Sequence, residues 1–346
     1  MELEKMTKFD LKNGSAAFIM PHWSNGGSGL ERQWLSKTLD TIKNQTDPNW
    51  KILIADGNSP SQEAKDYLKQ LEIEFAGKLE VINMPHSDGP GHARNVAIEK
   101  AYKDGHPFIV FLDADDLADP KRVEIARKIF LANEKAGVVY STFKVIDEHD
   151  NVVPREKLSQ SIVEILESHD TAPPQGQDTW IKIATETGYT NLTSATNVLT
   201  EIAHAHLFPG EKVSEDYYTW LVYSASGAEF VYTPDTPTHY RIPQNTEGSV
   251  SRSREGGKKG FYTTKCRVDE MGFVAASTIA LDRGAITADQ KTKLHIKFLL
   301  KEAETMGREE QLDLAEMCHA KAKELGAETT AQLLKELDFS SRPWVK

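Results

Sequence analysis

The sequence predicts an α/β protein with a mostly parallel sheet flanked by helices and a helical region at the C-terminal end. Three observations support this prediction. Short apolar runs alternate with amphipathic segments from residue 16 to about 143, polar residues follow several of these runs, and helical spacing dominates from about residue 285. Strands that alternate with helices are typical of a parallel sheet covered on both faces.

The predicted strands are apolar runs of strand length that end in polar or turn-forming residues. Because they are almost continuously apolar, we expect them to be buried on both faces. Ligands bind at the carboxyl ends of such strands, so the polar residues that follow them are candidate site residues. The strands are expected at 16–20, 51–56, 79–84, 108–113 and 138–143.

The predicted helices between the strands span 31–46, 92–105 and 121–137. In the first of them, Leu35, Leu39 and Ile42 recur at helical spacing. Residues 144–210 lose the alternation and contain the turn-rich stretch 171–180, which indicates loops and short helices that build the pocket of a second substrate. We assign the loops at about 144–250 to the side of the protein that binds this second, acceptor substrate.

The C-terminal part is predicted to contain a basic linker at 251–284 and a helical region at 285–346, after a catalytic domain at 1–250. A capping box at Thr287–Gln290 begins one helix, and two more are expected at 309–326 and 328–338. The basic linker is either a solvated loop or a contact for an anionic substrate. Its charges are Arg252, Arg254, Lys258, Lys259, Lys265 and Arg267.

Composition sets limits on the class of protein. With 39% hydrophobic and 27% charged residues, the 346-residue chain is typical of a soluble globular protein, and its net charge of −11 argues against non-specific attraction to nucleic acid. No apolar run is long enough to span a membrane, and the first residues do not resemble a secretory signal. Two cysteines are too few for a disulfide framework. We therefore expect a cytoplasmic protein.

An acidic cluster directly follows the apolar run at 108–112. At an effective dielectric of about 20, two like charges 4 Å apart repel by roughly 4 kcal/mol, so the cluster needs a compensating cation. Carboxylate oxygens suit Mg²⁺ or Mn²⁺, which keep positions open for phosphate oxygens. The alternative is that the aspartates end the strand and cap the next helix, above all Asp119. The cluster consists of Asp113, Asp115, Asp116 and Asp119.

One enzyme class with a similar local motif is the haloacid-dehalogenase type of phosphatase. There, Asp113 would attack phosphorus and Asp115 would act as an acid or base. That motif usually follows the first strand of its domain, whereas here it follows the fourth predicted strand. The phosphatase therefore remains a minor alternative.

Six motifs in order, between about residues 16 and 251, resemble those of the inverting family 2 glycosyltransferases with the GT-A fold. They are a strand ending in Pro21, QTDPNWKILIADGNS at 45–59, GPGHARN at 89–95, FLDADD at 111–116, ED at 215–216 and YR at 240–241. Each motif is weak by itself, and the ordered set is specific. The resemblance implies a GT-A, Rossmann-like sheet and sugar transfer from a nucleotide diphosphate-sugar, with a UDP-sugar as the leading candidate, to a hydroxyl acceptor.

The resemblance also implies roles for individual residues. Asp56 would hydrogen-bond the nucleotide base beside the backbone of Pro21 and His22, and Arg94 would lie near the ribose or diphosphate. Asp113 would approach the ribose and the metal.

For the metal and the reaction, Asp115 would bind the Mn²⁺ or Mg²⁺ that bridges the diphosphate. Asp216 would be the general base, and Glu215 would help to position it. Two departures from the family pattern are present. Ala55 replaces the first acidic residue before Asp56, and the usual histidine after Tyr-Arg is absent, so His239 or water would complete the metal shell.

The chemistry of inversion agrees with this assignment. A carboxylate must accept the acceptor's proton, and the charge of the departing diphosphate must be stabilised. Three alternatives stay open: a sugar-phosphate nucleotidyltransferase, the phosphatase, and a non-catalytic nucleotide-sugar-binding module. Against the first of them, residues 24–33 lack the lysine that is typical of the nucleotidyltransferase loop. The acceptor is open and anionic acceptors are included, among them a hydroxylated DNA base in a viral system. The C-terminal helices are candidates for oligomerisation.

Overall fold

The computed structural model describes residues 8–26, 29–86, 88–244 and 256–345. The chain forms two compact units. The sheet unit comprises the residues up to Gly176, Thr190–Lys212 and Ala228–Thr246. The helical unit comprises Gln177–Tyr189, Val213–Gly227 and the chain from Glu247 onward. The units therefore divide the chain differently from the predicted limits at 250 and 284, because two stretches from its middle group with the C-terminal helices.

The sheet unit contains a seven-stranded sheet in the order β3-β2-β1-β4-β6-β5-β7. Only β6 runs antiparallel to its neighbours, so the predicted mostly parallel α/β sheet is confirmed. The strands are β1 (Ala16–His22), β2 (Trp50–Asp56), β3 (Leu79–Asn83), β4 (Phe108–Phe111), β5 (Ala136–Ile146), β6 (Thr196–Leu199) and β7 (Glu229–Arg241).

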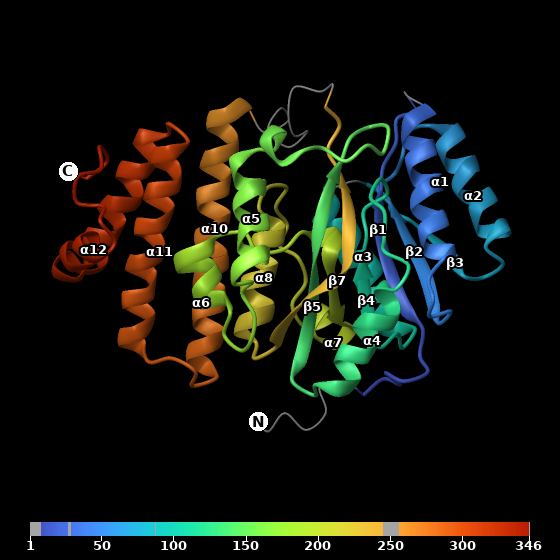
Figure 1. Ribbon diagram of the computed structural model, residues 1–346, viewed down its shortest axis with the longest axis horizontal. Helices are drawn as coiled ribbons and strands as arrows, with labels where there is room; N and C mark the ends of the chain where they lie inside the picture. The colour runs from blue at the N-terminus through green and yellow to red at the C-terminus, as the bar shows by residue number, and fades with distance from the viewer. Residues whose placement is uncertain (1–7, 27–28, 87, 245–255, 346) are drawn as a thin grey trace. The chain divides into compact units, whose positions relative to one another are not determined.

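The first helix of the sheet unit packs through the apolar stripe that the sequence predicted. In α1, Leu35, Leu39 and Ile42 are buried against the sheet core with Phe18 and Ile52. This burial of one face explains why the helical spacing of these residues is maintained. The helices are α1 (Gly29–Lys43), α2 (Gln62–Glu74), α3 (Pro90–Lys103), α4 (Arg122–Ala132), α5 (Gln160–Thr171) and α7 (Thr200–Ala205), with short 3₁₀ turns at Arg155–Lys157 and Thr193–Ala195 (Figure 1).

The helical unit confirms the predicted helical C-terminal region. Thr287 and Gln290 form the predicted capping box at the start of α11, and Gly326 (φ 176, ψ 94) interrupts α12 where two helices were predicted. The elements are α6 (Trp180–Lys182), a π-helical turn (Ile183–Thr187), α8 (Glu215–Ala225), α10 (Gly257–Asp282), α11 (Ala288–Arg308) and α12 (Leu312–Glu336).

The segment predicted as a basic linker at 251–284 differs in the structure. Residues 251–255 lie outside the described residues, and most of the remainder forms α10. Tyr262, Cys266 and Phe273 lie on its buried face. The lysines and glycines near its start obscured this apolar stripe, which continues through Ala276 and Ala280.

Candidate functional site

The ends of β1 and β2 bring together the first two candidate residues. His22 pairs with Asp56 in the register of the parallel strands, and His22 Nδ1 lies 2.8 Å from Asp56 Oδ1. Ser59 donates to both carboxylate oxygens, from its amide to Oδ2 at 3.0 Å and from Oγ to Oδ1 at 2.5 Å. Pro21 precedes His22 on β1 and pairs with Ala55. The predicted base-binding residues therefore share one corner of the sheet.

The electrostatics of this corner favour an ionised Asp56. Burial by itself would raise the pKa of Asp56, but hydrogen bonds from His22 and Ser59 outweigh it, so the pKa lies below its ordinary value. Asp56 is only 1% exposed. Its charge is fixed in position and can orient the donors around it, including those of His22.

A hollow borders His22 between the end of β1, α1 and α2. Within it, the Arg32 guanidinium lies over the Tyr67 ring at 4.2 Å from the centroid. An aromatic ring with a cation above it is a flat surface on which a base or sugar can pack. The lining residues are His22, Ser24, Gly26, Gly29, Glu31, Arg32, Leu35, Glu63, Ala64 and Tyr67.

Arg94 on α3 reaches the loop that follows β4. Its Nη2 lies 2.8 Å from Asp113 Oδ1, and its guanidinium lies 5.5 Å from the centre of the Phe208 ring. Arg94 is buried, whereas Asp113 is about one-third exposed. The structure therefore brings Arg94 and Asp113 together, and the carboxylate keeps an accessible side.

The acidic cluster lies in a turn that follows β4, since the Asp116 amide donates to the Asp113 carbonyl at 3.2 Å. Burial, reinforced by the neighbouring Asp113, raises the pKa of Asp115 to about 6. Burial also raises the pKa of Asp116, which accepts the Arg241 amide at 2.7 Å. The Arg241 guanidinium donates to the Asp115 carbonyl at 2.8 Å. Arg241 thus stabilises the turn through its hydrogen bonds to the Asp116 carboxylate and the Asp115 carbonyl.

This crowding of carboxylates fits a divalent cation. A cation beside Asp113 and Asp115 would offset the repulsion that raises the Asp115 pKa, and both side chains supply the oxygen ligands that Mn²⁺ and Mg²⁺ prefer. Asp116 is buried against Arg241 and is structural.

The structure does not bring His239 to this pair. Its backbone bridges to Leu117, and the charges that act on its imidazole belong to Lys144, Asp119 and Asp150. Asp119 accepts the Lys121 amide at 2.8 Å, but it does not cap the helix as predicted, because Lys121 is the N-cap residue of α4 and that helix start has no side-chain cap hydrogen bond. Within the described ranges, no group of three ligands that could hold a metal includes His239.

Asp216 and Glu215 begin α8 in the helical unit. The Asp216 carboxylate accepts the Tyr217 amide at 2.8 Å and lies 3.4 Å from the Tyr189 hydroxyl, whereas Glu215 is buried. Acidic residues in the first turn also interact favourably with the helix dipole. Contacts with the Tyr217 amide and the Tyr189 hydroxyl therefore fix the position of the Asp216 carboxylate.

A buried polar network that the sequence did not reveal supports this helix start. Ser214 adopts a left-handed conformation (φ 61, ψ 17) directly before α8 and donates to Asp269 of α10. Tyr189 lies within 2.6 Å of the same Ser214 oxygen. Asp269 pairs with Lys265, which lies 3.9 Å from Glu302 of α11. These contacts stabilise a backbone conformation that is unfavourable for serine.

The predicted basic segment is partly neutralised. Lys259 pairs with Asp313 at 2.7 Å, Lys258 lies 3.9 Å from Glu310, and Lys265 belongs to the buried network. Apart from Asp269, four residues after Lys265, these acidic partners lie at 302–313, far along the chain, so a local sequence window does not show them. Arg252 and Arg254 lie outside the described residues.

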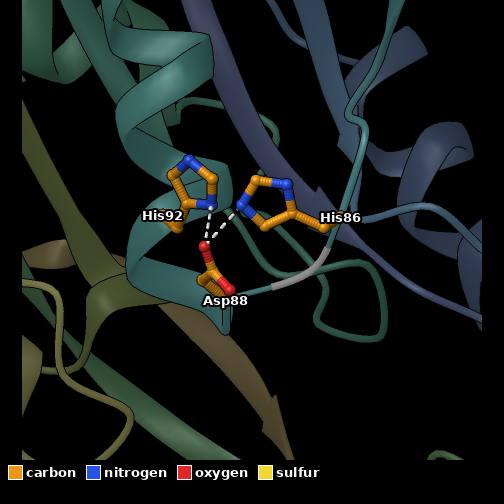
Figure 2. Close-up of side chains that lie close together, drawn as sticks. All are labelled: His86, Asp88 and His92. Atoms are coloured by element: carbon orange, nitrogen blue, oxygen red, sulfur yellow. Dashed lines mark ion pairs between the residues drawn. The ribbon is translucent and has the colours of Figure 1, made fainter.

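A second set of potential ligands, His86, Asp88 and His92, was missed by sequence reasoning (Figure 2). Its only signal in the sequence is a histidine, an aspartate and a histidine at 86, 88 and 92. This spacing crosses from a loop into α3, so neither strand nor helix periodicity exposes it.

None of the helices in the described part of the chain combines the length and apolar composition that crossing a membrane requires.

Part of the chain is similar to known glycosyltransferases. Residues 30–194 match the model of glycosyl transferase family 2. An uncharacterized glycosyltransferase of Methanocaldococcus jannaschii is 24% identical over 240 residues, which cover 67% of this chain and 74% of that protein. The Escherichia coli enzyme named UDP-Glc:alpha-D-GlcNAc-diphosphoundecaprenol beta-1,3-glucosyltransferase is 26% identical over 119 residues, covering 34% of this chain and 44% of that enzyme.

Two solved structures share the fold at low sequence identity. S. aureus TarS 1–349 in complex with UDP-GlcNAc superposes with a TM-score of 0.54 at 15% identity, covering 91% of this chain and 89% of that one. A mannosyltransferase of Pyrobaculum calidifontis with GDP-Man and Mn²⁺ gives 0.51 at 16% identity, covering 98% and 85%. The GT-A-type architecture predicted from the sequence is confirmed.

Proposed function

Because residues 30–194 match the model of glycosyl transferase family 2, we propose that this glycosyltransferase moves a sugar from a nucleoside diphosphate-sugar to a hydroxyl acceptor with inversion. The observation that carries the proposal is the set of side chains at the carboxyl ends of β1, β2 and β4. His22 and Asp56 meet at the ends of β1 and β2, and Asp113 follows β4, which runs parallel to β1 beside it. Such a sheet edge is where nucleotides bind in this class of fold.

The donor would be held by residues of the sheet unit. Asp56, ionised and oriented by Ser59, would accept a hydrogen bond from the base, and Pro21 and His22 would line the same pocket. Arg94 would contribute positive charge near the ribose or diphosphate, with Asp113 beside it. Relatives named for UDP-Glc and structures with UDP-GlcNAc or GDP-Man support a nucleotide-sugar donor.

Asp113 and Asp115 would hold a divalent cation. When bound there, Mn²⁺ or Mg²⁺ would neutralise charge on the departing diphosphate. The structure of the Pyrobaculum calidifontis mannosyltransferase contains Mn²⁺, which supports this assignment. His239 is not part of the proposed shell, since the charges around its imidazole come from other residues.

Asp216 would act as the general base. Its carboxylate would take the proton of the acceptor hydroxyl while the hydroxyl oxygen bonds to the anomeric carbon and the bond to the diphosphate breaks. Positioned proton transfer of this kind typically contributes about 10²- to 10⁴-fold to the rate. Glu215 would hold the first turn of α8 in place, since it is buried.

The test measures nucleoside diphosphate release from UDP- and GDP-sugars with Mn²⁺ in the presence of candidate acceptors. We expect Asp216→Asn to lower kcat by about 10²-fold or more with donor Kd unchanged. Asp115→Ala should weaken donor and Mn²⁺ binding together. Matched controls are Asp282→Asn in the helical unit and Asp235→Ala in the sheet unit, because both aspartates are exposed.

Three outcomes would contradict the proposal. Full turnover in Asp216→Asn would remove the assigned base, and donor binding in Asp115→Ala that keeps its Mn²⁺ dependence would remove the assigned cation site. Pyrophosphate exchange in place of diphosphate release would indicate a nucleotidyltransferase.

A further inference from the structure

His86, Asp88 and His92 converge on one point in the loop between β3 and α3. His86 Nε2 lies 2.7 Å and His92 Nδ1 lies 3.4 Å from the same oxygen, Asp88 Oδ2. One ligand atom from each residue lies within 4.8 Å of the others. Figure 2 shows both imidazole rings turned toward the carboxylate.

The backbone between these residues is shaped to bring them together. Gly89 has φ 95 and ψ 176, a conformation that residues with a side chain rarely adopt, and Pro90 then begins α3. Asp88 directly precedes Gly89, and His92 lies in the first turn of the helix. A Cβ at position 89 would also lie 3.3 Å from Lys212 Cγ.

Ordinary pairing explains only part of this arrangement. An ion pair accounts for His86 and Asp88, and an acidic side chain next to a helix start is favourable. His92 Nδ1, however, is buried and has no hydrogen-bond partner, because its approach to Asp88 lacks hydrogen-bond geometry. Buried polar nitrogens are rarely left unsatisfied. A cation among the three side chains would satisfy this nitrogen and both other ligands.

We propose that His86, Asp88 and His92 form a binding site for a divalent transition-metal ion of the zinc class, distinct from the cation at Asp113 and Asp115. Two imidazole nitrogens and a carboxylate oxygen are ligands that Zn²⁺ accepts, whereas Mg²⁺ prefers oxygen alone. Three protein ligands leave a fourth position open for water. The ion joins the loop after β3 to the first turn of α3, two residues before Arg94.

The test is calorimetric titration of the full-length, nucleotide-free protein with Zn²⁺ alone. We expect one saturable site in the wild type. His92→Ala and His86→Ala should each weaken it by at least about 10-fold, which is the loss that even an outer-shell partner typically causes. His149→Ala, at an exposed histidine outside the cluster, should bind Zn²⁺ like the wild type, and Asp115→Ala should retain the site that the His86 and His92 variants lose.

Thermal denaturation provides a second measurement, because a metal that binds only the folded state raises the melting temperature. Zn²⁺ should raise the Tm of the wild type and leave that of the His86→Ala/His92→Ala double variant unchanged. Without metal the two proteins should melt alike, since both side chains are at least one-third exposed.

The proposal is overturned if the wild type shows no saturable Zn²⁺ binding, or if the double variant binds as tightly as the wild type. It is equally overturned if Asp115→Ala abolishes the binding, because the ion would then belong to the other acidic corner. None of these results depends on sugar transfer, so the site and the proposed function can fail separately.

Discussion

Glu302 of α11 gives the sharpest test of the buried charges in the helical unit. It is 6% exposed and lies 3.9 Å from Lys265, whose other partner is Asp269. Burial raises the pKa of Glu302 to about 7, Lys265 opposes the shift, and Asp269 adds to it. Lys301 and Glu270 act in opposite directions and more weakly. Glu302→Gln removes this titrating group and retains the shape of the side chain.

The sign of the effect follows from the direction of the shift. Because the folded protein holds the Glu302 proton more tightly than the unfolded chain, the resulting stability is fully present below the ordinary pKa of 4.5 and is lost as pH rises through about 7. About 2.5 pKa units at about 1.4 kcal/mol each correspond to up to about 3 kcal/mol. Between pH 4.5 and pH 8, the free energy of unfolding should therefore fall by up to about 3 kcal/mol less in Glu302→Gln than in the wild type.

The assay is hydrogen exchange of α10 and α11, measured as a free energy of opening across this pH range. It reports on the helical unit even if the sheet unit unfolds separately. Glu324→Gln on α12 is the matched control, because Glu324 is exposed. A variant with the same pH slope as the wild type would refute the reasoning.

Three further predictions address packing and the donor corner. Gly272→Ala should lower the free energy of unfolding, measured by urea denaturation, by about 1–3 kcal/mol, because the new Cβ would lie 2.9 Å from Tyr218 Cα. Gly210→Ala, where a Cβ meets open space, should change it by no more than about 0.5 kcal/mol, and equal values for the two variants would contradict the packing argument. Ser59→Ala should raise the pKa of Asp56 toward its ordinary value, so less stability is lost as pH falls through the folded pKa; an NMR titration with an unchanged pKa would disprove this. Arg94→Met should weaken UDP binding by about tenfold in calorimetry, because the donor site loses one charge-assisted contact. Arg32→Met serves as a comparison, and an unchanged affinity of Arg94→Met for UDP would remove Arg94 from the donor site.

The first five strands of the sheet were predictable because each contains a short apolar run. Strands β1 to β5 all overlap the predicted segments. Strand β6 begins with the polar residues Thr196 and Asn197, and β7 contains Pro234 and Pro237, so neither has the apolar pattern of a buried strand. Helix α10 was hidden because its basic start resembles a loop.

The donor corner was predictable where the position of a residue follows from a strand. His22 and Asp56 end neighbouring parallel strands, so their pairing follows from register. The contact between Arg94 and Asp113 depends on how α3 packs, and the contacts of Ser214 with Asp269 depend on α10. Such long-range contacts leave no periodic signal in a single sequence.

The interleaving of the two compact units limits how the protein can be dissected. A fragment that ends at residue 244 would retain every strand, but Ser214 would lose the Asp269 carboxylate that anchors its left-handed backbone. The segment that carries Glu215 and Asp216 would then be free to relax. A minimal catalytic fragment therefore has to extend through α10 and α11, and truncation is a poor substitute for point substitution in this chain.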